Sequence, residues 1–155
     1  MNKTLLVQIF VIASIVGAYF FIDFNKVYNS LRGEVEYVTQ NTNCDLHKSP
    51  CEITTKDGTK FTLEVFPKEI PLMENLKFKL TSSNDKLENL KINIYATNMF
   101  MGYFNLKFEN LGNGIYEANG TLPTCPVGNM QWNADIELDK ITQRTGARFQ
   151  FQTTR

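Results

Sequence analysis

The chain has 155 residues, and its 16 lysines and arginines balance its 16 aspartates and glutamates. Because no basic run interrupts this mixture, the composition argues against a nucleic-acid-binding protein, which normally carries a concentrated basic face. The chain has one histidine, His47, so it cannot assemble a zinc site from several histidines of its own.

Residues Leu5 to Ile22 form an uncharged and largely apolar run. As a helix this run would be roughly 27 Å long, close to the hydrocarbon thickness of a bilayer. We therefore predict a transmembrane anchor that continues into a short amphipathic stalk. A cleaved signal peptide is the alternative, but the bulky aromatic residues at the end of the run suit a cleavage site poorly. A lipoprotein is disfavoured because no cysteine follows the run.

The anchor and stalk are expected over residues 1–32, with a single domain over residues 33–155. A signal-anchor that exports the long carboxy-terminal part is the simpler topology. The expected location is the bacterial inner membrane, crossed once, with the carboxy-terminal domain in the periplasm.

Beyond Gly33 the apolar residues recur at every second position, which is the period of a β-strand with one wet face. Asp57-Gly58 favours a tight hairpin turn between strands at 52–55 and 60–66, because these residues tolerate positive backbone angles. Further strands are expected at 76–81, 90–97, 104–109, 115–121 and 132–139. Alternation is weaker at 33–40, and Phe149 with Phe151 closes the chain.

Seven or eight short antiparallel strands with no helical pattern predict an all-β fold, namely an immunoglobulin-like antiparallel β-sandwich. A closed barrel is the alternative. Trp132, and Met130 in phase with it, are expected in the core.

The three cysteines are Cys44, Cys51 and Cys125. Cys44 and Cys51 enclose a short loop that could be closed by a disulfide in an exported domain. The competing interpretation makes both thiols and His47 metal ligands, although the spacing is not that of a zinc knuckle. His47 is otherwise expected to be a solvated loop residue.

Met99 and Met101 are candidate ligands of Cu(I). If the alternation of the strand before them persisted, both thioethers would lie on its wet face, where soft ligands could select Cu(I). Cys125 could be a third soft ligand, a buried thiol or a disulfide partner. Alternatively, a bulge resets the register and both methionines simply pack.

No catalytic constellation is evident. His47 is the one histidine that could activate Cys125, and a cysteine-histidine pair also needs a third group to orient it. We therefore expect a protein that is not an enzyme, with a thiol-disulfide role for Cys125 as the surviving enzymatic alternative.

Four short motifs resemble the YtkA-like and FixH-like families of membrane-anchored, exported domains: Asn98 to Gly102 (NMFMG), Gly112 to Tyr116 (GNGIY), Gly120 to Pro123 (GTLP) and Met130 to Trp132 (MQW). The resemblance implies an immunoglobulin-like fold. For the FixH-like branch it also implies copper supply or assembly of a respiratory haem-copper oxidase, with Met99 and Met101 as the matching methionines. The alternative is a non-metal interaction module that binds a membrane or periplasmic protein on the periplasmic face.

Overall fold

The structure is a computed structural model and describes residues 4, 36–124, 128–138 and 145–154. The chain divides into two compact units, Met1–Glu34 and Val35–Arg155, and the second carries the fold described below. Among the described residues, no helix has the length and apolar character needed to cross a bilayer. The predicted anchor at Leu5 to Ile22 lies outside the described residues.

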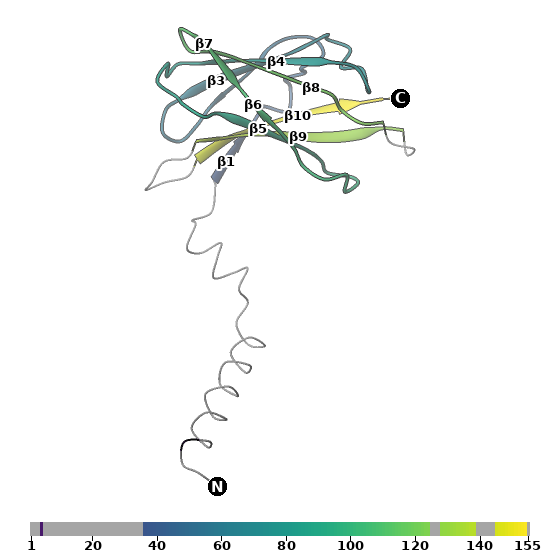
Figure 1. The fold of residues 1–155 in the computed structure, drawn as a ribbon. Helices are drawn as coiled ribbons and strands as arrows, with labels where there is room; N and C mark the ends of the chain where they lie inside the picture. Colours follow the sequence, from purple (N-terminus) through teal and green to yellow (C-terminus); the bar gives the residue numbers. More distant parts are fainter. Residues whose placement is uncertain (1–3, 5–35, 125–127, 139–144, 155) are drawn as a thin grey trace. The chain divides into compact units, whose positions relative to one another are not determined.

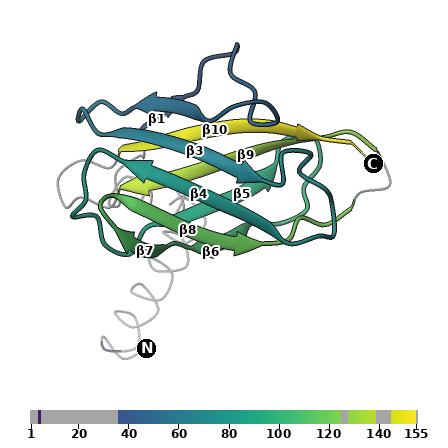
Figure 2. The same cartoon turned by 90° about the horizontal axis from the view of Figure 1, so that it is seen from above.

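The described part of the second unit is all-β. Its strands are β1 Glu36–Thr39, β2 Cys51–Thr54, β3 Lys60–Phe66, β4 Leu76–Ser82, β5 Lys91–Ala96, β6 Phe104–Lys107, β7 Glu109–Gly112, β8 Ile115–Gly120, β9 Met130–Leu138 and β10 Thr145–Thr153. They form a first sheet in the order β1-β10-β9-β5-β6 and a second in the order β2-β3-β4-β8-β7. The two sheets lie one above the other (Figures 1 and 2).

The core lies between the two sheets, because each strand directs its apolar face inward. Phe61, Leu63 and Val65 of β3 are buried, as their alternation predicted. Met130 and Trp132 of β9 are also buried, which confirms their predicted place in the core. The indole N–H of Trp132 donates to the hydroxyl of Thr153 at 2.9 Å, so its polar atom is satisfied inside the core.

The predicted hairpin between β2 and β3 is present. Gly58 has a φ of 84°, the left-handed conformation that the turn requires of it. The carboxylate of Asp57 accepts hydrogen bonds from the backbone N–H of Thr59 at 3.3 Å and from its hydroxyl at 3.0 Å. The Asp-Gly pair therefore stabilises the turn through both its backbone and its side chain.

Two details differ from the sequence prediction. The single strand expected at 104–109 is divided, because the chain crosses from the first sheet to the second at Phe108. The Phe108 ring is buried at this crossing, and its N–H donates to the carbonyl of Leu90 at 3.0 Å. In addition, β1 pairs with β10 in parallel, whereas all strands were expected to be antiparallel.

The loop between β1 and β2 connects the first sheet to the second. Cys44 and Cys51 form the predicted disulfide, with their Cα atoms 5.8 Å apart. Leu46 inserts into the core from the same loop and is fully buried. The loop is thus held by a covalent bond at its base and by an apolar anchor at its centre.

Candidate functional site

The outer face of the first sheet carries a continuous set of polar side chains. They occupy alternate positions of β9 and β10, opposite the apolar positions that enter the core. Two of them, Asn133 and Asp135, are only 7% and 3% exposed although they belong to the outer face. Neighbouring side chains must therefore cover Asn133 and Asp135. These neighbours, together with the two residues, form the candidate site.

Arg148 covers Asp135 and forms a bidentate ion pair with it. The two residues are directly opposite in the β9–β10 ladder. Arg148 Nε donates to Asp135 Oδ1 and Nη2 donates to Oδ2, each at 2.7 Å. This pairing raises the pKa of Arg148, so the guanidinium is a permanent cation here. A buried carboxylate is tolerated at this position because both its oxygens are engaged.

Tyr37 lies beside this pair on β1. The Arg148 guanidinium lies 4.4 Å from the centre of its ring, which is a cation–π contact. The Tyr37 hydroxyl donates to Glu137 Oε1 at 2.6 Å. Burial and this bond raise the pKa of Tyr37. Gly146 leaves room for the Tyr37 ring, because a Cβ atom at position 146 would lie only 2.7 Å from carbon atoms of that ring.

Tyr95 and Asn133 continue the network along the sheet. The Tyr95 hydroxyl donates to Asp135 Oδ2 at 3.2 Å and accepts from Asn133 Nδ2 at 3.1 Å. Gln150 Nε2 then donates to Asn133 Oδ1 at 3.0 Å. Burial raises the pKa of Tyr95, so its hydroxyl remains a donor at neutral pH. The result is one connected chain of bonds from Arg148 to Gln150, and such networks are rigid when every member is satisfied.

A groove of about 620 Å³ lies at the Gln150 end of this network. Its floor is the outer face of β9 and β10, and its wall is the loop that follows β1. Gln131 and Gln152 face each other across the ladder in this floor, as do Asn133 and Gln150. Two cross-strand pairs of side-chain amides thus form the floor of the groove.

The wall of the groove is fastened to the edge of β10 by two side chains. Gln40 Nε2 donates to the carbonyl of Gln150 at 2.7 Å, and His47 Nε2 lies 2.7 Å from the carbonyl of Gln152. His47 Nδ1 lies 2.8 Å from the carbonyl of Lys68. His47 is therefore not the solvated loop residue that the sequence indicated. Instead, its ring joins β10 of the first sheet to the loop after β3 of the second.

The loop between β5 and β6 projects beside the groove. We call residues 97–103 the aromatic tip. Phe100 is 81% exposed and Tyr103 is 60% exposed, and their ring centres are 6.1 Å apart. The ring of Tyr103 also contacts that of Tyr95 at 5.4 Å. Asn98 fixes the base of the tip by donating to the carbonyl of Asn129 at 2.9 Å.

The predicted copper ligands lie partly in this tip. Strand β5 ends at Ala96, so the alternation that would have put both thioethers on one strand face stops before it reaches them. Met99 is 42% exposed, whereas Met101 is partly buried and packs against the core. Cys125 lies outside the described residues, and the copper site stays a prediction. Among the described residues, no group of three or more His, Cys, Asp or Glu could hold a metal ion.

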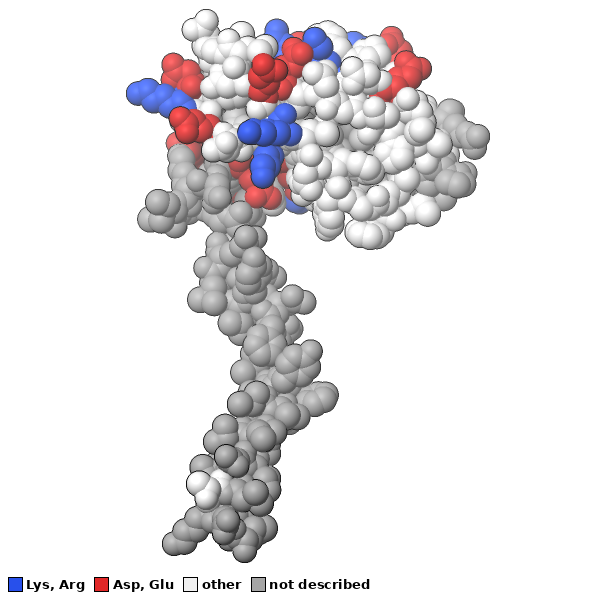
Figure 3. Space-filling model, in the orientation of Figure 1, with Lys and Arg blue, Asp and Glu red and all other residues white. Residues whose placement is uncertain are grey.

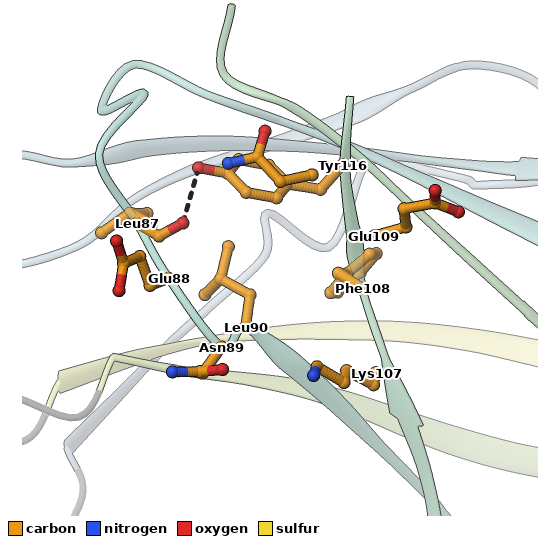
Figure 4. A pocket seen from close by; sticks show the side chains of 9 residues that line it. Leu87, Glu88, Asn89, Leu90, Lys107, Phe108, Glu109 and Tyr116 are labelled. Carbon is orange, nitrogen blue, oxygen red and sulfur yellow. Dashed lines mark hydrogen bonds between the residues drawn. The ribbon is translucent and has the colours of Figure 1, made fainter. Parts of the chain in front are cut away.

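A second hollow, of about 530 Å³, lies at the other side of the domain where the chain crosses between the sheets. Figure 4 shows its lining side chains, with the Tyr116 hydroxyl bonded to the carbonyl of Leu87 at 3.1 Å. Glu88, Glu109 and Lys107 surround the opening, and no histidine or cysteine is among the residues that line it.

Charged residues are absent from long stretches that reach the aromatic tip and the groove. Residues 92–106 and 118–134 contain no Lys, Arg, Asp or Glu. Figure 3 shows the consequence, since the lower right part of the visible face, where the β5–β6 loop lies in Figure 1, is free of charged side chains. Reading these gaps in the charge pattern, together with the alternating Gln and Asn residues of β9 and β10, could have located the site from sequence.

Comparison of the chain with protein-family models, curated proteins and solved structures found no match. The resemblance to the YtkA-like and FixH-like families accordingly stays a prediction.

Proposed function

We propose that this protein is a membrane-anchored, immunoglobulin-like interaction module that docks on a partner protein through the aromatic tip. The strand order supports the immunoglobulin-like class. The series β10-β9-β5-β6 corresponds to strands G, F, C and C′, and β3-β4-β8-β7 corresponds to A, B, E and D. The disulfide departs from the antibody pattern because it closes a loop instead of joining the two sheets.

Two features support an exported, anchored location. The run from Leu5 to Ile22 is long enough to span a bilayer. The Cys44–Cys51 disulfide fits an oxidising compartment such as the periplasm, since disulfides are rare in the cytosol. The domain would then display its tip to membrane or periplasmic proteins.

The exposure of Phe100 carries the docking proposal. A phenylalanine side chain gains about 1.5–3 kcal/mol when it leaves water, so an 81% exposed ring is stabilised by a partner that covers it. Methionine and aromatic residues are enriched at the centres of interfaces, and charged residues are depleted there. Met99, Phe100 and Tyr103 in an uncharged surrounding have this composition.

The experiment is native electrophoresis of the full chain extracted from its own membranes. Phe100→Ser removes the central ring of the tip. Leu111→Ser is the matched control, because Leu111 is an exposed apolar residue on β7 of the other sheet. The wild type and Leu111→Ser are expected to migrate in one larger complex, and Phe100→Ser as the free protein. Identical migration of all three would contradict the proposal.

A further inference from the structure

The groove whose floor carries the side-chain amides of Gln131, Asn133, Gln150 and Gln152, which we call the amide groove, has the size of a small-ligand site. Its volume of about 620 Å³ lies within the range of known ligand pockets. It is separate from the exposed ring of Phe100, although Thr97 at the start of the aromatic tip borders it. Its chemistry has to be explained by a ligand of its own.

The floor of the groove is uncharged and rich in hydrogen-bonding groups. Gln131, Asn133, Gln150 and Gln152 each present an amide, which has both a donor and an acceptor. Among the described residues, Asp45 is the one acidic residue that lines the wall, and its carboxylate already has partners. The Asp45 carboxylate accepts the backbone N–H of His47 at 3.0 Å, a bond that lowers the pKa of Asp45, and it also pairs with Lys48 at 3.3 Å. The groove therefore selects for a neutral, polar ligand.

The groove is poorly suited to a polypeptide. A peptide strand would add to the sheet through the edge of β10, but the carbonyls of Gln150 and Gln152 there already face Gln40 and His47. A peptide side chain would need an apolar pocket, yet Trp132 and Phe151 under the floor are buried in the core. Neither of these two modes of peptide recognition is open.

Hydroxyl groups match the floor better. A hydroxyl is both donor and acceptor, as a side-chain amide is, so adjacent hydroxyls of a sugar ring can pair with adjacent amides. The side-chain oxygen of Gln40 on the groove wall is buried and has no hydrogen-bond partner among the described residues, and a hydroxyl is the kind of donor that would satisfy it. Asn133 is held by Tyr95 and Gln150 before any ligand arrives, which reduces the entropy lost on binding.

The floor is connected to the hydrogen-bond network of the sheet, because Tyr95 bonds to Asn133 at 3.1 Å. From these observations we infer that the amide groove binds a neutral saccharide chain, with its amides on the hydroxyls of the sugar.

The test is an NMR titration of the isotope-labelled full chain in a detergent that contains no sugar. The probes are short neutral oligosaccharides built from glucose, mannose, xylose or N-acetylglucosamine. At least one of them is expected to shift the side-chain amide signals of Gln131 and Gln152. Oligogalacturonate, which is anionic, is expected to bind more weakly than that neutral probe.

Three variants give the result its specificity. Gln131→Ala combined with Gln152→Ala removes one amide pair from the floor, and both residues are exposed, so the fold is preserved. Binding is expected to weaken at least tenfold. Gln152→Glu keeps the size of the side chain but adds a charge, and it should also weaken binding. Asn105→Ala, an exposed amide on β6 outside the groove, should bind as the wild type does.

Four results would overturn the inference: no response to any neutral oligosaccharide, equal binding by the double variant, tighter binding of oligogalacturonate, or a response only to a neutral peptide of glycine, serine and asparagine. The inference is independent of the docking proposal. Phe100→Ser should retain saccharide binding, and the double glutamine variant should retain the larger complex.

Discussion

The imidazole of His47 reaches from the loop after β1 to the carbonyl of Gln152, with its Nε2 atom 2.7 Å from that oxygen. Its Nδ1 atom lies 2.8 Å from the carbonyl of Lys68. The ring thereby links β10 of the first sheet to the loop after β3 of the second through both of its nitrogen atoms.

We predict that His47→Ala lowers the free energy of unfolding by about 1–2 kcal/mol, because both ring contacts between the sheets are lost. Chemical denaturation of the two proteins measures the difference. Lys48→Ala, at an exposed neighbour, is the control. Equal stability of His47→Ala and the wild type would contradict the account.

Arg148 and Asp135 give a second prediction, about a buried charge. Arg148→Met removes the two hydrogen bonds from the guanidinium to the carboxylate of Asp135. The free energy of unfolding should therefore fall by about 3–5 kcal/mol. Asp135→Leu combined with Arg148→Met removes both charges and should cost less than the single arginine variant. Lys60→Ala breaks the exposed pair with Glu52 and should change stability by about 0.5 kcal/mol or less. Denaturation of the four proteins tests this, and equal losses for the two arginine variants would contradict it.

Tyr37 gives a prediction at alkaline pH. Burial and its bond to Glu137 raise the pKa of Tyr37 in the folded state, while the unfolded chain ionises near the ordinary value of about 10. The contribution of Tyr37 is thus fully present below about pH 10 and is lost as the pH rises further. The stability difference between the wild type and Tyr37→Phe should shrink between about pH 9 and pH 11. A constant difference over this range, measured by urea denaturation, would show that the phenol ionises freely in the fold.

The copper hypothesis is tested by titrating the full chain with Cu(I) kept reduced by ascorbate, in competition with a coloured chelator. If the thioethers are ligands, Met99→Ala combined with Met101→Ala should weaken binding about tenfold, and Cys125→Ser should weaken it as well. Met73→Ala removes another exposed methionine and should have no effect. Unchanged affinity in the methionine double variant would reject these ligands.

Local patterns predicted much of the fold. Alternation identified β3, β4, β5 and β9, and Asp57-Gly58 located the hairpin, because these signals arise from neighbouring residues. Cys44 and Cys51 were also close enough in sequence for their disulfide to be predicted.

Features set by distant parts of the chain were missed. Alternation runs without a break through Phe108, so nothing local indicates that the strand divides there between two sheets. The pairing of Arg148 with Asp135 depends on register across a hairpin, and any outward polar residue of these strands has the same pattern. His47 binds main-chain carbonyls, which leave no trace in residue type.

Docking through the aromatic tip is the central claim, and photo-crosslinking in the native membrane tests it most directly. A benzophenone amino acid replaces Phe100 in one protein and Leu111 in another, so that two exposed apolar positions on different sheets are compared. The account predicts one discrete, light-dependent adduct from position 100 that is missing from position 111. No adduct at position 100, or the same adduct from both positions, would contradict it.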